Sequence, residues 1–282
     1  MNPLETILSW STLSFELILC GFVFIRRVDR VLPFFTAYAY ALLGSTIGVW
    51  LTYECFGFDS NAAYFAYWIS VLVNAAARSL AIVELCRYGL QAYRGIWALV
   101  WRFLTGLSVV LLAHAAVDAW GQPRGLAIYG ATLDRDLALA SIAVLAALFL
   151  VRYHYSLDVN PTQRLIAAGI CLICAVDVIG NTIIRKLFTG YLFSWFLSSQ
   201  EAQASWPSVR PQFMHVADIW SAVHLFFFML SMGIWSFALR KPLLEQSERP
   251  ILLPAGIYQE LSPAINLRLS AFNDRLVELL KP

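Results

Sequence analysis

The strongest constraint in this sequence is a series of long apolar runs, each about as long as the helix that crosses a lipid bilayer. A hydrocarbon core about 30 Å thick is spanned by about 20 residues of α-helix. Runs of that kind, separated by Pro, Gly or charged residues, cover roughly residues 5–25, 33–54, 62–86, 96–117, 133–153, 164–186 and 214–239. The pattern predicts an all-α polytopic membrane protein, a bundle of seven transmembrane helices.

The composition favours a membrane protein over a soluble one. Of the 282 residues, 60% are hydrophobic and 13% are charged, whereas a soluble domain carries about 25% charged residues. The net charge of +2 offers no basic patch of the kind that nucleic acids require, so no nucleic-acid partner is expected. The five cysteines are scattered and mostly lie in apolar runs, which argues against a disulfide framework.

The distribution of Lys and Arg between the runs predicts the orientation. One set of connections carries ten basic residues: Arg26, Arg27, Arg30, Arg87, Arg94, Arg152, Arg164, Arg240, Lys241 and Arg249. The opposite set carries five: Arg124, Arg135, Arg185, Lys186 and Arg210. Because basic residues concentrate in cytoplasmic loops, we expect an outer N-terminus, an inner C-terminus and a multi-pass location in a bacterial inner membrane. Residues 1–242 then form the transmembrane domain.

Two segments lie outside the predicted spans. Residues 187–213 are predicted to be a long loop rich in aromatic side chains. The loop is an ordered cover over the bundle, a hairpin or short interfacial helix on the outer surface, or a segment with a role in ligand entry. Residues 243–282 form a cytoplasmic tail with an amphipathic helix at about 262–281. Its apolar stripe consists of Ile265, Leu269, Phe272, Leu276 and Leu279. The stripe packs on the bundle or the membrane surface, or it binds a cytoplasmic protein partner or a second copy of the chain.

Polar side chains within the spans form the first candidate site, because ionisable groups are costly in hydrocarbon and usually have a partner. They are Glu16, Asn74, Arg78, Asp177, Asn181 and His224. The alternating helix directions bring them to one central slab, where we expect Arg78 to pair with Glu16 or Asp177. Such a slab either locks the helices together, or binds a ligand or relays protons.

A second candidate site lies toward the outer side, where a hydrated vestibule is expected. Its residues are His114, Asp118, His215 and Asp218, with Asp134, Arg135 and Asp136 on the same side. Their spacing matches no strong metal or haem site, so no metal and no cofactor are predicted. Cys171 and Cys174 lie inside an apolar run and are interpreted as packing residues, and Glu84 with Arg87 as an ordinary helix-end pair. No phosphate-binding loop or catalytic motif occurs, so no catalytic residue is predicted.

Four stretches carry a resemblance to a known group of proteins. They are residues 33–38 (PFFTAY), 64–68 (YFAYW), 78–84 and 133–136 (LDRD). In these stretches the chain resembles a family of uncharacterised bacterial integral membrane proteins with seven helices. The resemblance implies an architecture and no activity. Seven helices in this orientation also resemble the membrane sensor modules of some bacterial histidine kinases, a likeness of fold that does not fix function.

Three hypotheses for the function follow from the sequence. The first is a non-enzymatic sensor, receptor-like or accessory protein, in which the polar centre responds to a small ligand and the tail helix passes the change to a partner. The second is a small-molecule or proton-coupled transporter, since charges within the membrane also mark transport pathways. The third is a membrane-embedded haem or metal protein that uses His114, His215 and His224.

Overall fold

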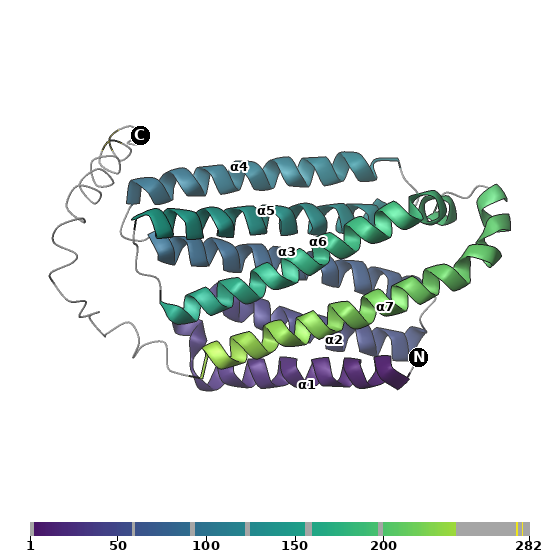
Figure 1. Ribbon diagram of the computed structural model, residues 1–282, viewed down its shortest axis with the longest axis horizontal. Helices are drawn as coiled ribbons and strands as arrows, with labels where there is room; N and C mark the ends of the chain where they lie inside the picture. The colour runs from purple at the N-terminus through teal and green to yellow at the C-terminus, as the bar shows by residue number, and fades with distance from the viewer. Residues whose placement is uncertain are drawn as a thin grey trace.

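The structure is a computed structural model, and the part of the chain that it describes contains seven long helices and one short helical turn (Figure 1). The structure describes residues 3–57, 60–90, 94–121, 125–155, 160–196 and 200–240, together with Arg275 and Glu278; at 3–9, 94, 152–155, 181, 183–196 and 200–218 it describes the backbone alone. The elements are α1 (Pro3–Ile25), the 3-10 turn η1 (Val28–Arg30), α2 (Pro33–Phe56), α3 (Asn61–Leu90), α4 (Arg94–Ala119), α5 (Gly125–Tyr155), α6 (Pro161–Phe196) and α7 (Gln200–Ala238). Within these ranges the structure contains no β-strand, which confirms an all-α fold.

Helix boundaries follow from residues with special backbone properties. Pro33 lies in the first turn of α2, where the missing N–H would have no partner in any case. The side chain of Asn160 accepts a hydrogen bond from the backbone N–H of Thr162 at 2.9 Å, so it caps α6, which begins with Pro161. Gly57 follows α2 with a φ of 78°, a conformation that glycine adopts without steric cost.

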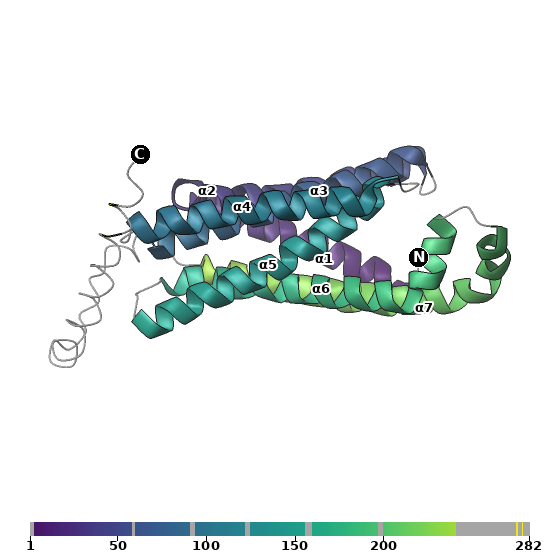
Figure 2. The same cartoon turned by 90° about the horizontal axis from the view of Figure 1, so that it is seen from above.

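Six of the helices form a closed ring, and the seventh lies outside it. Neighbours in the ring are α1, α2, α3, α5, α6 and α7, and the ring closes because α7 packs on α1. Helix α4 packs on the outside, mainly against α5 and more weakly against α3. Seen from above, α2, α3 and α4 lie on one side and α6 and α7 on the other, with α1 and α5 between them (Figure 2).

Five helical segments are long and apolar enough to cross a membrane. They are Pro33–Phe56, Asn61–Leu90, Gly95–Ala119, Pro161–Gly180 and Ile219–Ala238. Large apolar side chains such as Phe103, Val109 and Val117 of α4 are exposed on the outside of the bundle, a surface that suits lipid and would be a liability in water. These helices indicate a multi-pass membrane protein.

Two further helices are less apolar, so the number of spans stays a prediction. In α1 the stretch described with its side chains, Trp10–Ile25, is shorter than a full span. In α5, the consecutive residues Asp134, Arg135 and Asp136 interrupt the apolar sequence. The seven-span count and the orientation therefore belong to the proposal below.

Three boundaries differ from those predicted by the sequence. Helix α5 begins at Gly125 and not near residue 133, so Asp134 lies well inside the helix. Helix α6 continues to Phe196 and α7 begins at Gln200, so most of 187–213 is helical and not a loop. Pro207 and Pro211 lie within α7, and Figure 1 shows the first part of α7 turned away from the rest, as proline within a helix predicts. The tail stripe lies outside the described residues.

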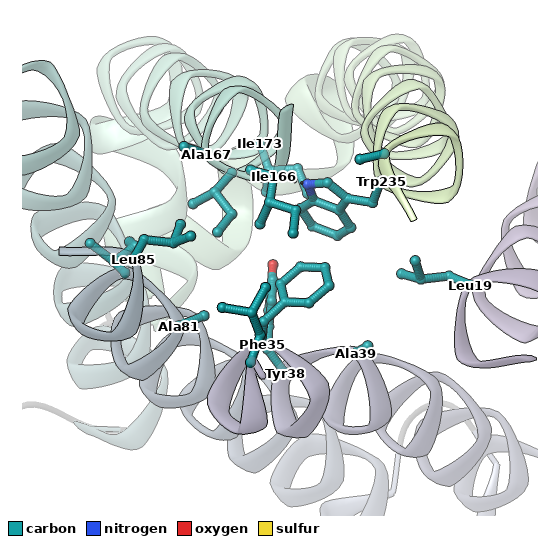
Figure 3. Packing of buried hydrophobic residues seen from close by; sticks show 14 of the residues in the cluster. Leu19, Phe35, Tyr38, Ala39, Ala81, Leu85, Ile166, Ala167, Ile173 and Trp235 are labelled. Carbon is teal, nitrogen blue, oxygen red and sulfur yellow. Dashed lines mark hydrogen bonds between the residues drawn. The ribbon is translucent and has the colours of Figure 1, made fainter. Parts of the chain in front are cut away.

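The buried apolar core holds α2, α6 and α7 together through one indole ring (Figure 3). Trp235 is fully buried and makes edge-to-face contacts with Phe35 at 5.4 Å and Tyr38 at 5.8 Å between ring centroids. Its Nε1–H donates to the backbone oxygen of Ile166 at 3.0 Å, and the ring lies on Gly169, where a Cβ atom would overlap it. The contact therefore fixes how α7 sits along α6.

Candidate functional site

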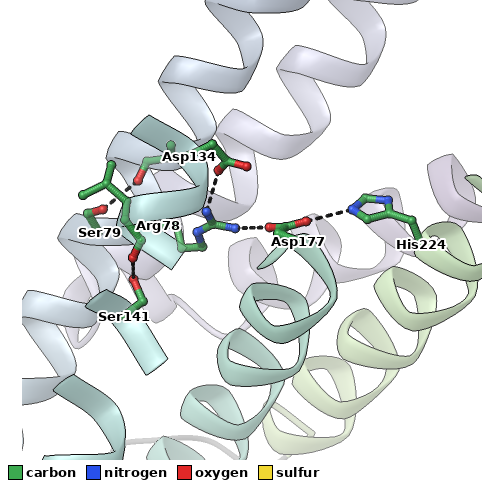
Figure 4. Close-up of polar contacts among 8 residues, drawn as sticks. Arg78, Ser79, Asp134, Ser141, Asp177 and His224 are labelled. Carbon is green, nitrogen blue, oxygen red and sulfur yellow. Dashed lines mark hydrogen bonds and ion pairs between the residues drawn. The ribbon is translucent and has the colours of Figure 1, made fainter. Parts of the chain in front are cut away.

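Four helices meet in one buried network of charged side chains (Figure 4). Arg78 of α3 donates from Nη1 to Oδ2 of Asp177 on α6 at 2.5 Å, and from Nη2 to Oδ1 of Asp134 on α5 at 2.6 Å. The second oxygen of Asp177 lies 3.0 Å from Nε2 of His224 on α7. The polar network Asp134–Arg78–Asp177–His224 therefore links four of the six helices of the ring.

Burial increases along the network toward Arg78. The Arg78 side chain is 5% exposed and that of Asp177 is 12% exposed, whereas His224 is 38% exposed. Charges removed from water are tolerated when an opposite charge and further hydrogen bonds compensate them. Two carboxylates and one guanidinium leave a net charge of −1, which becomes zero when His224 is protonated. With a neutral imidazole the network is therefore anionic, and His224 lies at its more accessible end.

A glycine–tryptophan contact fixes the helix pair that carries Asp177 and His224. Trp220 lies against Gly180, where a Cβ atom would overlap the indole ring. Gly180 is one turn along α6 from Asp177, and Trp220 is one turn along α7 from His224. Because only glycine lets the ring approach this closely, the contact holds the two helices at the separation that the Asp177–His224 contact needs.

One nitrogen of the network has no partner among the described residues. Nε of Arg78 is buried and makes no hydrogen bond there. A buried donor without an acceptor costs free energy, about 1–3 kcal/mol in mutational data. The network therefore contains one buried donor, Nε of Arg78, that has no acceptor among the described residues.

The other residues of the predicted polar slab form two separate contacts. Thr46 of α2 donates to Oε1 of Glu16 on α1 at 2.9 Å, and Ser45 donates to Oδ1 of Asn74 on α3 at 3.2 Å. Of the two partners expected for Arg78, the structure shows Asp177, and Glu16 contacts Thr46 instead. The side chain of Asn181 lies outside the described residues.

The predicted outer residues form two contacts between α4 and α5. Nδ1 of His114 lies 2.7 Å from Oδ2 of Asp136, whose other oxygen accepts a hydrogen bond from Arg135 at 2.8 Å. Thr132 donates to Oδ2 of Asp118 at 2.6 Å. The side chains of His215 and Asp218 lie outside the described residues. In the part of the chain described with side chains, no group of three His, Cys, Asp or Glu residues could hold a metal ion.

Two residues of the polar contacts were not identified correctly from the sequence. Asp134 was assigned to the outer side, whereas it binds Arg78 inside the bundle. Glu84 was interpreted as part of a helix-end pair, whereas it is buried and accepts hydrogen bonds from the backbone N–H groups of Phe34 and Phe35, at 3.2 and 2.9 Å. The sequence holds one indirect signal for this contact. Leu32 precedes Pro33 and has no side-chain acceptor for the backbone N–H groups at the start of α2, so their acceptor has to come from elsewhere in the fold.

Comparisons of the chain with protein-family models, with curated proteins and with solved structures find no match. The resemblance to bacterial seven-helix membrane proteins therefore stays a prediction from the sequence.

Proposed function

We propose that this protein is a non-enzymatic membrane sensor, receptor-like or accessory protein, with seven spans, an outer N-terminus and a cytoplasmic tail in a bacterial inner membrane. The observation that carries the proposal is the polar network Asp134–Arg78–Asp177–His224, which joins four helices through one charge cluster. A change of charge in such a cluster acts on every helix that contributes to it. A switch inside a membrane requires such a coupling between one charge and several helices.

The charge of the network indicates the class of ligand. With His224 neutral, one negative charge is uncompensated, and Nε of Arg78 offers a donor with no acceptor. A small organic cation that also carries an acceptor oxygen, such as an amino alcohol, matches both features. An anionic ligand would add to the negative charge of the two carboxylates and is disfavoured.

The route of the signal follows the chain from the network. Helix α7 carries His224 and ends at Ala238, from which the chain continues into the tail. We propose that ligand binding changes the contact between His224 and Asp177, shifts α7 relative to α3 and α5, and moves the tail. The apolar stripe Ile265, Leu269, Phe272, Leu276 and Leu279 then binds a cytoplasmic protein partner or a second copy of the chain.

Native mass spectrometry of the protein released from detergent micelles tests the ligand. The probes are a panel of small alkylamines and amino alcohols, with Na⁺ and K⁺ for comparison. We expect a saturable amine adduct on the wild type that is lost in Asp177→Asn and retained in Glu54→Gln, a change of an exposed residue. Equal adducts on the wild type and Asp177→Asn, or none on either, would contradict the proposal.

A pull-down experiment tests the role of the tail separately. Replacing Ile265, Leu269 and Leu276 with Asp removes the apolar stripe and leaves the bundle unchanged. We expect this variant to lose a partner, or self-association, that the wild type shows. Unchanged capture would assign the tail to the membrane surface or to the bundle.

Transport is the second candidate, because the network lies within a closed ring of helices and ionisable groups in that position also mark transport pathways. Uptake of the amine probe into proteoliposomes tests it. A transporter would accumulate the probe inside the vesicles, and Asp177→Asn would abolish the accumulation. A sensor would bind the probe without moving it.

A further inference from the structure

A further acidic group is buried in the bundle, away from the polar network and with no charged partner among the described residues. Glu16 of α1 is 2% exposed, and its Oε1 accepts a hydrogen bond from Thr46 at 2.9 Å. Its Oε2 is buried and makes no hydrogen bond to the described residues. From this environment we infer that Glu16 is a proton-binding site, held as a neutral carboxylic acid between α1 and α2.

The helices that form this contact carry no positive charge. Neither α1 nor α2 contains a single Lys, Arg or His. The titratable groups nearest along these helices are Cys20, one turn from Glu16, and the tyrosines of α2, Tyr38, Tyr40 and Tyr53; Glu54 lies further along α2. All of these groups are neutral or acidic, so none of them compensates a carboxylate.

The two other elements packed against α1 supply no cation to Glu16 either. In α7, the charged or titratable side chain between residues 219 and 238 is His224, which contacts Asp177. At η1, Arg26, Arg27 and Arg30 accompany Asp29 at the end of α1, and all four are exposed. An isolated carboxylate in this interior would cost far more free energy than the neutral acid, so the group takes up a proton.

A metal cation is a poorer ligand for this position than a proton. Hard cations such as Ca²⁺ and Mg²⁺ require about six or more oxygen ligands. Among the residues described with side chains, no group of three His, Cys, Asp or Glu residues lies here to hold such an ion, and the contact at Glu16 is a single hydrogen bond from the Thr46 hydroxyl group. A proton needs one oxygen, and Oε2 of Glu16 is that atom. Gain or loss of this proton changes the charge between α1 and α2 by one unit, independently of the polar network.

Infrared spectroscopy of the protein in lipid bilayers tests the inference directly. The carbonyl stretch of a protonated carboxyl group absorbs apart from the amide and carboxylate bands. We expect such a band in the wild type at pH 7, a small shift in D₂O because the proton exchanges, and loss of the band in Glu16→Gln. Thr46→Val should shift the band to higher frequency, because Oε1 loses its hydrogen bond.

Two variants serve as matched controls. Ser45→Ala removes the neighbouring hydroxyl group, which donates to Asn74 and not to Glu16, and should leave the band in place. Asp177→Asn disrupts the polar network and should also leave it unchanged. If Glu16→Gln does not fold, protein labelled with [¹³C]glutamate identifies the band: it shifts with both the label and Thr46→Val. A wild-type spectrum without the band at pH 7, or a band insensitive to Glu16→Gln and to the label, would overturn the inference.

Discussion

Acidic groups are buried on two sides of the ring, and the two sides compensate them differently. Where α3, α5, α6 and α7 meet, Asp134 and Asp177 share one guanidinium group. Between α1 and α2, Glu16 accepts a hydrogen bond from the hydroxyl group of Thr46 and has no charged partner among the described residues. An ion pair keeps the first two acids charged, while the absence of a cation favours a proton on the third. Buried carboxyl groups are therefore compensated by an ion pair on one side of the ring and, as we infer, by a proton on the other.

A fourth buried acid, Glu84, shows that a cation is not the only means of stabilising a charge here. Both oxygens of Glu84 accept backbone N–H bonds from the first turn of α2, and Pro33 before them has no N–H to offer. Backbone donors at a helix N-terminus stabilise a negative charge. Glu16 lies beside the middle of the same helix, where the backbone N–H groups are already bonded within the helix. Glu84 therefore lies where α2 offers unpaired backbone N–H groups, and Glu16 lies where α2 offers none.

The largest effect is expected for Arg78→Gln, which removes the shared cation. Two carboxylates would then lie buried and uncompensated, and breaking a buried ion pair in this way costs about 3–5 kcal/mol of unfolding free energy. Reversible unfolding in mixed detergent micelles measures this cost. Adding Asp134→Asn and Asp177→Asn to Arg78→Gln should recover most of it, since no charge remains. A single variant as stable as the wild type would show that the acids are already neutral, and would remove the contrast with Glu16.

Glu84→Ala is expected to have the next largest effect. It leaves two backbone N–H groups of α2 without acceptors, and a hydrogen bond to a charged group contributes about 1.5–3 kcal/mol. Hydrogen exchange of the Phe34 and Phe35 amides, together with unfolding in micelles, measures local and global effects. Glu54→Ala, at an exposed position near the other end of α2, is the control and should change little. An equally small effect of both variants would show that Glu84 does not hold α2.

The fold could largely be predicted from the sequence, because length and apolarity decide which segments become membrane helices. Helix α2 begins at Pro33, the first residue of the predicted second run, and α6 begins at Pro161, three residues before the predicted sixth run. Proline favours the first turn of a helix. The beginning of α5 was missed because the charges at 134–136 resemble the end of a span, although residues 125–132 are helical. Pro211, which lies just before the predicted seventh run, favours a loop before it because proline is ordinarily disfavoured within a helix, yet the structure places it inside α7.

The candidate site was predicted less completely, because partners depend on which helices are neighbours. The depth of Arg78 and Asp177 could be counted along the sequence, and so their pairing was among the expected ones. The second partner, Asp134, required the correct start of α5. The partners of Glu84 are backbone N–H groups at the beginning of α2. The pattern of side chains along the sequence does not show that Glu84 of α3 lies next to these groups.

A smaller effect is expected for His224→Leu, at the accessible end of the polar network. His224 is 38% exposed, and partly exposed ion pairs contribute about 0.2–1 kcal/mol. We therefore expect a loss of stability below about 1 kcal/mol, but a strong loss of amine binding if His224 contacts the ligand. Unfolding in micelles and the amine adduct in native mass spectra measure the two effects on one sample. A loss of several kcal/mol would place His224 among the structural ion pairs with Arg78.

The smallest effect is expected for Glu16→Gln, and this variant separates the two sides of the ring most clearly. A glutamine has nearly the shape of a protonated glutamic acid, and its amide oxygen still accepts the hydrogen bond from Thr46. Replacing a neutral group by one of the same shape is nearly neutral, so the unfolding free energy should change by no more than about 0.5 kcal/mol. Asp177→Asn is the matched comparison, since the same carboxyl-to-amide change there removes a charge that Arg78 needs. A loss of 2 kcal/mol or more in Glu16→Gln, measured by the same unfolding experiment, would mean that Glu16 is ionised and has a cationic partner.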